Sequence, residues 1–223
     1  MTQRESSSTE RRGLLRSVNC KSDEWLPEVL AALDDDGCVV VHNVLSPHLI
    51  ADIRAALWIA KDAVEREISI DRLRAAGEFG VVRTPMRYDP RMFELLAVEP
   101  VLQVVDATVS ATAILHTQNG FVLPATDEAN TSSFQSSFHM DFPRVLNGYL
   151  ASVNTLVAID EFREDNGATR VVLGSHQSSA QPDVSELHAR SVAATCPAGS
   201  MVVFDSTLWH AAGPNASANR GWR

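Results

Sequence analysis

The sequence predicts a mainly β protein with flanking helices. The expected core is a double-stranded β-helix of the jelly-roll or cupin-like type, with helices packed on one outer sheet. In the first half, apolar residues recur at helical spacing as far as Ser110. From Ala111 onward they fall in short runs separated by Gly, Pro, Asn and Asp, which is typical of sandwich and barrel strands. Because there is no internal repeat and no long linker, residues 23–223 are expected to form one domain behind a disordered tail, residues 1–22.

Helix signals follow one another along the first half. Residues 23–36 place apolar side chains three and four positions apart, and Gly37 follows as a typical helix stop. Ser46 and Pro47 form a capping residue and first-turn proline that open a second helix. Three further segments are expected to be helical: residues 65–76, 89–98 and 100–110.

Short apolar or β-branched runs predict the strands. Two of these lie among the helices, at residues 38–41 and 81–83. Six more are expected in the second half: residues 113–123, 134–141, 149–159, 169–172, 192–195 and 201–204. The loop 124–133 is rich in Thr, Asp, Glu and Asn, and we expect it at the mouth of the barrel, where it can act as a lid.

Composition and charge narrow the class of function. The net charge is −9 and no basic residues cluster on one face, so a nucleic-acid partner is not expected. No apolar run is long enough to cross a bilayer, and residues 1–16 lack the apolar segment of a secretory signal. Cys20, Cys38 and Cys196 are widely spaced and are expected to be reduced thiols. Together these features favour a cytoplasmic protein.

A candidate metal site is the feature on which the functional interpretation depends. His139 and Asp141 are two residues apart, so on an extended chain their side chains project from the same face. A strand-like run, residues 201–209, leads directly to His210. If His210 lies beside the pair, two imidazoles and one carboxylate occupy one face of a metal, the arrangement found in non-heme Fe(II) oxygenases.

Two further motifs accompany these residues. Residues 165–176 read D-N-G-x-x-x-V-x-x-G-S-H, and residues 209–217 read W-H-x-x-G-x-N-x-S, with Arg220 shortly after. With the His-x-Asp pair, these blocks make the sequence resemble the phytanoyl-CoA dioxygenase family over most of its length. Within the first block, Asn166 and His176 are expected to build turns rather than to bind metal.

The resemblance implies an iron enzyme. His139, Asp141 and His210 would hold Fe(II), and 2-oxoglutarate and O₂ would be the co-substrates. Arginine suits the far carboxylate of 2-oxoglutarate because its planar fork pairs bidentately with a carboxylate. Arg220 is the candidate that the resemblance implies, and Arg223 competes with it.

Three other residues are weaker candidates for the co-substrate site. Gln118 and Asn119, on the strand before the metal segment, are candidates for the C1 carboxylate, with edge-strand polar residues as the alternative reading. Arg83 is a candidate for binding the co-substrate or an anionic substrate group. The alternative for Arg83 is a surface salt bridge.

The sequence therefore predicts an Fe(II)- and 2-oxoglutarate-dependent dioxygenase that hydroxylates a small organic molecule and releases succinate and CO₂. Desaturation, epimerisation or cyclisation of a secondary metabolite by the same iron centre is one alternative. A non-catalytic jelly-roll protein that binds a metal or ligand is another. The exposed helical half also leaves a homodimer open.

Overall fold

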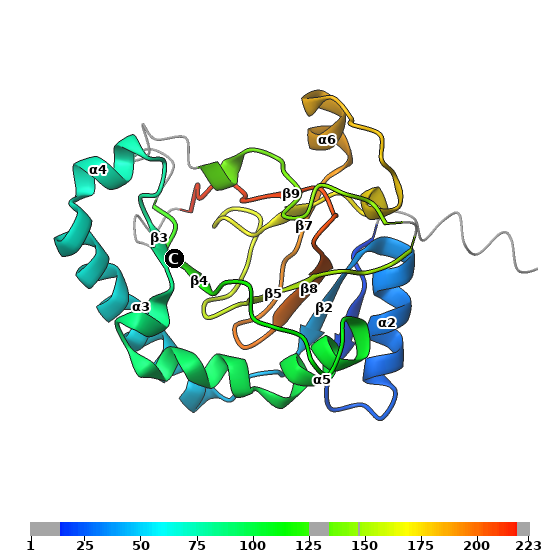
Figure 1. Ribbon diagram of the computed structural model, residues 1–223, viewed down its shortest axis with the longest axis horizontal. Helices are drawn as coiled ribbons and strands as arrows, with labels where there is room; N and C mark the ends of the chain where they lie inside the picture. Colours follow the sequence, from blue (N-terminus) through cyan, green and yellow to red (C-terminus); the bar gives the residue numbers. More distant parts are fainter. Residues whose placement is uncertain (1–13, 125–133, 147, 218–223) are drawn as a thin grey trace, which may run out of the picture.

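The computed structural model describes residues 14–124, 134–146 and 148–217, and its strands pair into three small sheets (Figure 1). The main sheet has the order β1-β2-β8-β5, formed by Ser17–Asn19, Cys38–His42, Met201–Asp205 and Val153–Val157. The second sheet has the order β7-β6-β9, formed by Val192–Ala193, Arg170–Val171 and His210–Ala211. The third is a ladder of β3 and β4, formed by Val81–Arg83 and Asn119–Phe121.

The main sheet is buried on both faces, which explains why β2 and β8 are continuous apolar runs. Strand β8 pairs antiparallel with both β2 and β5, with Val202 opposite Val40 and Val203 opposite Thr155. Because side chains alternate along a strand, Val203 faces one core cluster and Val202 the other.

Helices cover one face of this sheet. Helix α2, Trp25–Asp36, and helix α5, Glu99–Thr108, pack against each other and against the sheet. Their apolar side chains form one core cluster with β2 and β8. Gly37 ends α2 in the left-handed conformation, with its N–H donating to the Leu33 carbonyl.

The second sheet packs on the opposite face of the main sheet. Val171 of β6 shares a core cluster with Val40 and Val202, and Leu208, which precedes β9, is fully buried in the same cluster. The order helix layer, main sheet, second sheet places β9, and therefore His210, beyond the face of the main sheet opposite to the one that α2 and α5 cover.

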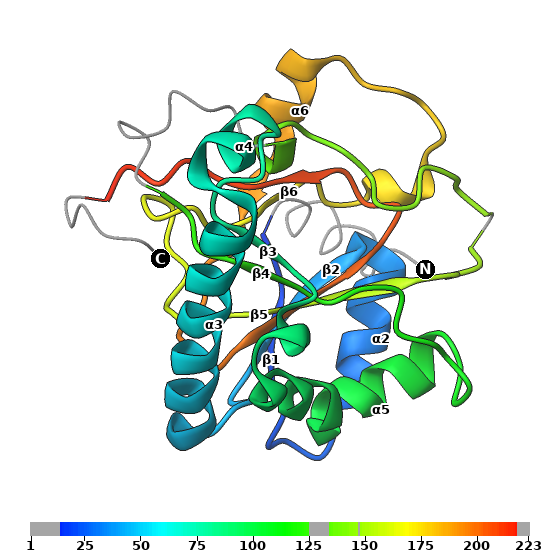
Figure 2. The same cartoon turned by 60° about the vertical axis from the view of Figure 1, so that its left-hand side comes forward.

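Helix α3, Pro47–Ile68, is the longest element and runs along one side of the sheets (Figure 2). The Ser46 hydroxyl accepts a hydrogen bond from the Leu49 N–H, as the capping signal predicts. Ser69, with φ of 74°, separates α3 from α4, Ile70–Ala75, so the expected charged helix over 65–76 is divided between two helices. No helix in the described ranges is long and apolar enough to cross a membrane.

The described chain mixes helix and sheet: the expected flanking helices are present, but the strands are only two to five residues long, so the sheets are smaller than a mainly β class implies. Two of the expected strands are shorter in the structure. Residues 113–123 are strand only at β4, and Ile114, which precedes β4, is 90% exposed. Residues 134–141 form a 3₁₀ turn, Phe134–Ser136, and then make a β-bridge only at His139. Residues 89–98 are a 3₁₀ helix, Pro90–Ala97, rather than an α-helix.

The missed elements include one strand and one helix. The expected tail of residues 1–22 is wrong at its end, because β1 pairs parallel with β2 and buries Val18. Helix α6, Val184–Arg190, lies between the second-half strands. The sequence signal for this helix is Asp183 followed three residues later by Glu186. In the structure the Asp183 carboxylate caps the helix by accepting from the Glu186 N–H.

Candidate metal centre

His139, Asp141 and His210 lie together, although the chain between Asp141 and His210 includes β5, β6, α6, β7 and β8. An isolated antiparallel bridge joins the two histidines: the His139 N–H donates to the His210 carbonyl at 2.9 Å, and the reverse bond is 3.0 Å. The bridge places the two imidazole rings side by side, with centroids 4.3 Å apart.

The turn after β8 delivers His210 to this bridge. The Asp205 carboxylate accepts from the Thr207 N–H at 2.7 Å and from its hydroxyl at 2.8 Å, which closes a local turn. The Leu208 side chain then fills the apolar space between the sheets, so the following histidine is carried at the edge of a packed core.

The three side chains converge on one point. His139 Nε2 lies 3.6 Å from Asp141 Oδ1, and His210 Nε2 lies 3.6 Å from Asp141 Oδ2. One ligand atom from each residue lies within 4.8 Å of the others. Two imidazole nitrogens and a carboxylate oxygen at these separations can bind one divalent cation and leave further positions open for other ligands.

Backbone carbonyls select the ring nitrogen that each histidine offers to a metal. His139 Nδ1 lies 2.8 Å from the Ser137 carbonyl, and His210 Nδ1 lies 2.9 Å from the Leu208 carbonyl. Because a carbonyl oxygen only accepts, each Nδ1 carries the proton and each Nε2 keeps its lone pair. Both Nε2 atoms face Asp141. This is the protonation pattern that a metal-binding histidine needs.

The three side chains differ in burial. Those of His210, His139 and Asp141 are 8%, 18% and 46% exposed. Burial lowers the pKa of His210 below its ordinary value, and nearby His139 acts in the same direction. The imidazole of His210 is therefore kept neutral, the form that binds a metal.

Sequence reasoning missed a polar network behind the carboxylate. Asn154 Nδ2 donates to Asp141 Oδ2 at 2.9 Å and to the Ser206 hydroxyl at 3.1 Å. The Ser206 hydroxyl donates in turn to the Ser152 hydroxyl at 2.9 Å. The available signal was an asparagine inside β5, at its second position, where the other residues are Val, Thr, Leu and Val.

The D-N-G block builds turns, as expected. The Asn166 amide oxygen accepts from the Arg163 N–H at 2.8 Å, and its amide nitrogen donates to the Glu161 carbonyl at 2.8 Å. The G-S-H end of the block hydrogen-bonds the backbone of Trp209, the residue before His210. The Ser175 hydroxyl accepts from the Trp209 N–H at 2.9 Å, and the Val172 N–H donates to the Trp209 carbonyl at 2.9 Å.

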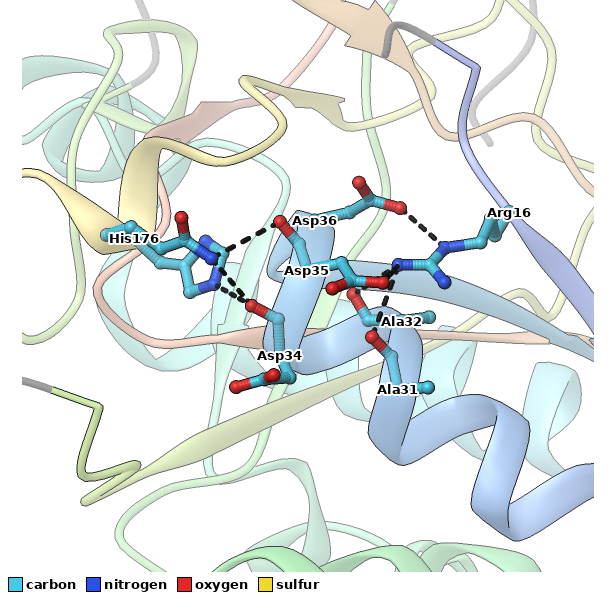
Figure 3. Close-up of polar contacts among 8 residues, drawn as sticks. Arg16, Ala31, Ala32, Asp34, Asp35, Asp36 and His176 are labelled. Atoms are coloured by element: carbon cyan, nitrogen blue, oxygen red, sulfur yellow. Dashed lines mark hydrogen bonds and ion pairs between the residues drawn. The ribbon is translucent and has the colours of Figure 1, made fainter. Parts of the chain in front are cut away.

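His176 fastens this turn to the end of helix α2. Its Nε2 lies 3.1 Å from the Asp34 carbonyl, one of the last carbonyls of the helix (Figure 3). On the far side of the same helix end, Arg16 pairs with Asp36 at 2.6 Å and with Asp35 at 3.0 Å (Figure 3). His176 therefore links the helix layer to the His210 segment and is not part of the metal cluster.

The predicted co-substrate residues that the structure describes contact other parts of the chain, and the remaining ones lie outside the described residues. Arg83 forms an ion pair with Glu78 at 2.6 Å, and it stands opposite Asn119 in the β3–β4 ladder. The Gln118 amide nitrogen donates to the Met92 carbonyl at 3.0 Å, while its amide oxygen is buried without a protein partner. Roles for these residues in binding 2-oxoglutarate stay predictions. Arg220, Arg223 and most of the expected lid, residues 124–133, lie outside the described residues.

Comparison with known proteins relates this chain to the family whose motifs the sequence contains. The profile of the family described as Phytanoyl-CoA dioxygenase (PhyH) matches residues 33–223. The uncharacterized protein Rv1501 of Mycobacterium tuberculosis is 48% identical over 201 residues, covering 90% of this chain and 74% of its own. Dioxygenase cdmD of Talaromyces verruculosus is 42% identical over 78 residues, covering 34% of this chain and 25% of its own.

A solved structure shares the fold. The crystal structure of EctD from S. alaskensis with 2-oxoglutarate and 5-hydroxyectoine superimposes with a TM-score of 0.70, covering 91% of this chain and 73% of that one. The sequence identity is 21%, so this likeness concerns the fold alone. With the profile spanning all three candidate ligands and both motifs, the chain belongs to the phytanoyl-CoA dioxygenase family.

Proposed function

We propose that the protein is an Fe(II)- and 2-oxoglutarate-dependent dioxygenase that hydroxylates a small organic molecule. The observation that carries this proposal is the convergence of two Nε2 lone pairs and one carboxylate within 4.8 Å. The donor set contains no thiolate, and two imidazoles with one carboxylate are the usual ligands of non-heme Fe(II) oxygenases. Family membership supports the same assignment.

Bound here, Fe(II) would supply the activation of O₂ that couples loss of CO₂ from 2-oxoglutarate, leaving succinate, to oxidation of a C–H bond. The chain's own residues have simpler tasks. His139 and His210 present fixed nitrogen ligands because their Nδ1 protons are engaged by backbone carbonyls. Asp141 contributes negative charge. The Phe204 ring, 4.7 Å from the His210 ring, makes the buried side of the site apolar.

The rest of the proposal follows from this assignment. The main and second sheets would be the two layers of a jelly roll, within one domain. Arg220 would bind the far carboxylate of 2-oxoglutarate. Desaturation, epimerisation or cyclisation remains open for the same centre, because each begins with oxidation of a substrate C–H bond.

An anaerobic spectrum tests the proposal. Adding Fe(II) and 2-oxoglutarate to the folded protein should produce a weak visible charge-transfer band, and adding either alone should not. The His210→Ala variant is the matched control and should give no band. If the folded protein gives no band at saturating concentrations of both, the assignment is wrong. Release of succinate under O₂ would separately eliminate a non-catalytic metal-binding protein.

A pair of variants tests the arginine. Loss of a charge-assisted hydrogen bond costs about 1.5–3 kcal/mol, so Arg220→Leu should weaken 2-oxoglutarate binding by about 10- to 100-fold. Arg223→Leu should leave the Kd unchanged. The opposite pattern, measured by titrating the visible band, would assign the carboxylate to Arg223 instead.

A further inference from the structure

The two kinds of ligand in the metal centre are held in different ways. Each histidine is fixed by a carbonyl two residues earlier in its own chain segment, Ser137 for His139 and Leu208 for His210. Asp141 is the most exposed of the three ligands. The terminal torsion of an aspartate is broad, so a half-exposed carboxylate needs an external contact to hold one orientation. The structure provides that contact from β5.

We propose that Asn154, held in turn by Ser206 and Ser152, is the positioning residue that orients the Asp141 carboxylate toward the metal. This inference rests on the proposed function, since it concerns the same centre. It assigns a role to three residues outside the His-x-Asp, D-N-G and W-H motifs.

The hydrogen-bond chemistry allows only one direction for the first contact. An ionised carboxylate can only accept, so the Asn154 side chain must present its NH₂ group to Asp141 Oδ2 at 2.9 Å. The same NH₂ group has a second hydrogen, and it meets the Ser206 hydroxyl at 3.1 Å. Both donors of the amide are thereby used, and the amide plane has one preferred orientation.

Ser206 is suited to fix that amide because it is itself buried and anchored. Its hydroxyl donates to the Ser152 hydroxyl at 2.9 Å, and its N–H donates to the Ser152 carbonyl at 3.2 Å. Its own carbonyl accepts from the Phe142 N–H at 2.9 Å. Ser206 therefore restrains the backbone directly after Asp141 as well as the amide that contacts the Asp141 side chain.

One oxygen of the Asp141 carboxylate is therefore already hydrogen-bonded in the metal-free protein. With Oδ2 engaged by Asn154, rotation of the carboxylate is restricted and Oδ1 stays beside His139 Nε2. Partners that orient a metal ligand are typically worth about 10- to 100-fold in metal affinity. A neutral donor also serves better than a cation here, because it leaves the charge of the carboxylate to the metal.

Metal titration of the full-length apoprotein tests the inference, with Co(II) alone as the probe and its visible absorption as the readout. Asn154→Leu keeps the volume but removes both donors, and it should raise the Kd for Co(II) by about 10- to 100-fold. Thr155→Val is the matched control, because Thr155 is the next residue of β5 and faces the opposite side of the sheet. Its Kd should equal that of the wild type. Ser206→Ala should weaken binding in the same direction by a smaller factor.

The outcomes separate the two proposals. If a folded Asn154→Leu protein binds Co(II) within twofold of wild type, the positioning role is wrong while the metal centre stands. If the wild type itself does not bind Co(II), the proposed function fails and this inference fails with it. Should Asn154→Leu lose its far-UV circular dichroism, Asn154→Ala, which adds no atoms, takes its place. The same loss of affinity is then required of the alanine variant.

Discussion

The candidate metal centre joins two segments that are built very differently. The His210 arm, residues 205–211, is buried except at Trp209, and its last two residues pair with β6 as strand β9. The His-x-Asp arm, residues 135–142, has no buried residue and meets the sheet at a single bridge. Half of the site is thus part of the core, and the other half lies over it.

This difference suggests how metal binding and order are coupled. The His210 arm is fixed by packing whether or not a metal is present, because Leu208 and Phe204 belong to the core between the sheets. The His-x-Asp arm depends on a few hydrogen bonds, among them those at His139 and Phe142. Part of the metal's binding free energy should therefore be used to order this arm.

The largest expected effect comes from removing one histidine from each arm. Both His210→Ala and His139→Ala should weaken Co(II) binding by more than about 100-fold, beyond the range for outer partners of a ligand. Only His210→Ala should also destabilise the apoprotein, by about 1–3 kcal/mol, because its ring packs in the core against Phe204. Co(II) titration and urea unfolding measure the two quantities. Equal apoprotein stabilities would remove the distinction between the arms.

A leucine in each arm region separates packing from ligation. Leu208→Ala empties a fully buried position and should cost about 2–5 kcal/mol in the free energy of unfolding. Leu146→Ala, just beyond the His-x-Asp arm and 40% exposed, should cost less than about 0.5 kcal/mol. Chemical denaturation of the two apoproteins gives both values. A large loss in the Leu146 variant would show that this region packs more tightly than its exposure indicates.

A glycine pair tests the link between helix α2 and the His210 arm. Gly37 has φ of 74°, and an added Cβ would collide with the His176 ring and the Leu208 side chain. Gly37→Ala should therefore cost about 2–4 kcal/mol, from backbone strain plus overpacking. Gly174, with φ of 76°, has open space around it, so Gly174→Ala should cost only about 1–2 kcal/mol of strain. If thermal unfolding shows equal losses, the contact between His176 and Gly37 contributes little.

The smallest expected effect is a difference in the alkylation rates of the cysteines, which depend on how deeply each thiol is buried. Burial raises the pKa of Cys196 to about 11 and also raises the pKa of Cys38. At pH 8 only about one Cys196 thiol in a thousand is a thiolate, so alkylation should be slow and should rise about tenfold per pH unit. Cys20, which is partly exposed, should react first. Mass spectrometry after iodoacetamide treatment gives the order, and early modification of Cys38 would indicate that the main sheet opens readily.

Much of the fold near the main sheet was predictable from local signals. The helix ending at Gly37, the helix opening at Ser46 and the buried run at 201–204 all appear in the structure close to their expected bounds. Their patterns are strong because packing on both faces of a sheet, or on one face of a helix, leaves a regular apolar spacing. Residues 134–141 were harder to predict, because a segment that forms only a single β-bridge has no regular spacing of apolar residues.

The sequence by itself determined the chemistry of the centre: which three side chains can act as ligands, and which blocks of residues accompany them. Only the tertiary structure decided their supports and neighbours. Asn154 meets Asp141 because β5 lies beside β8, Val18 joins the main sheet through a pairing with β2, and Arg83 turns to Glu78. The physical reason is that these contacts depend on which strands become neighbours. Which strands pair depends on the apolar area buried in the whole core, so it cannot be predicted from the local spacing of residues.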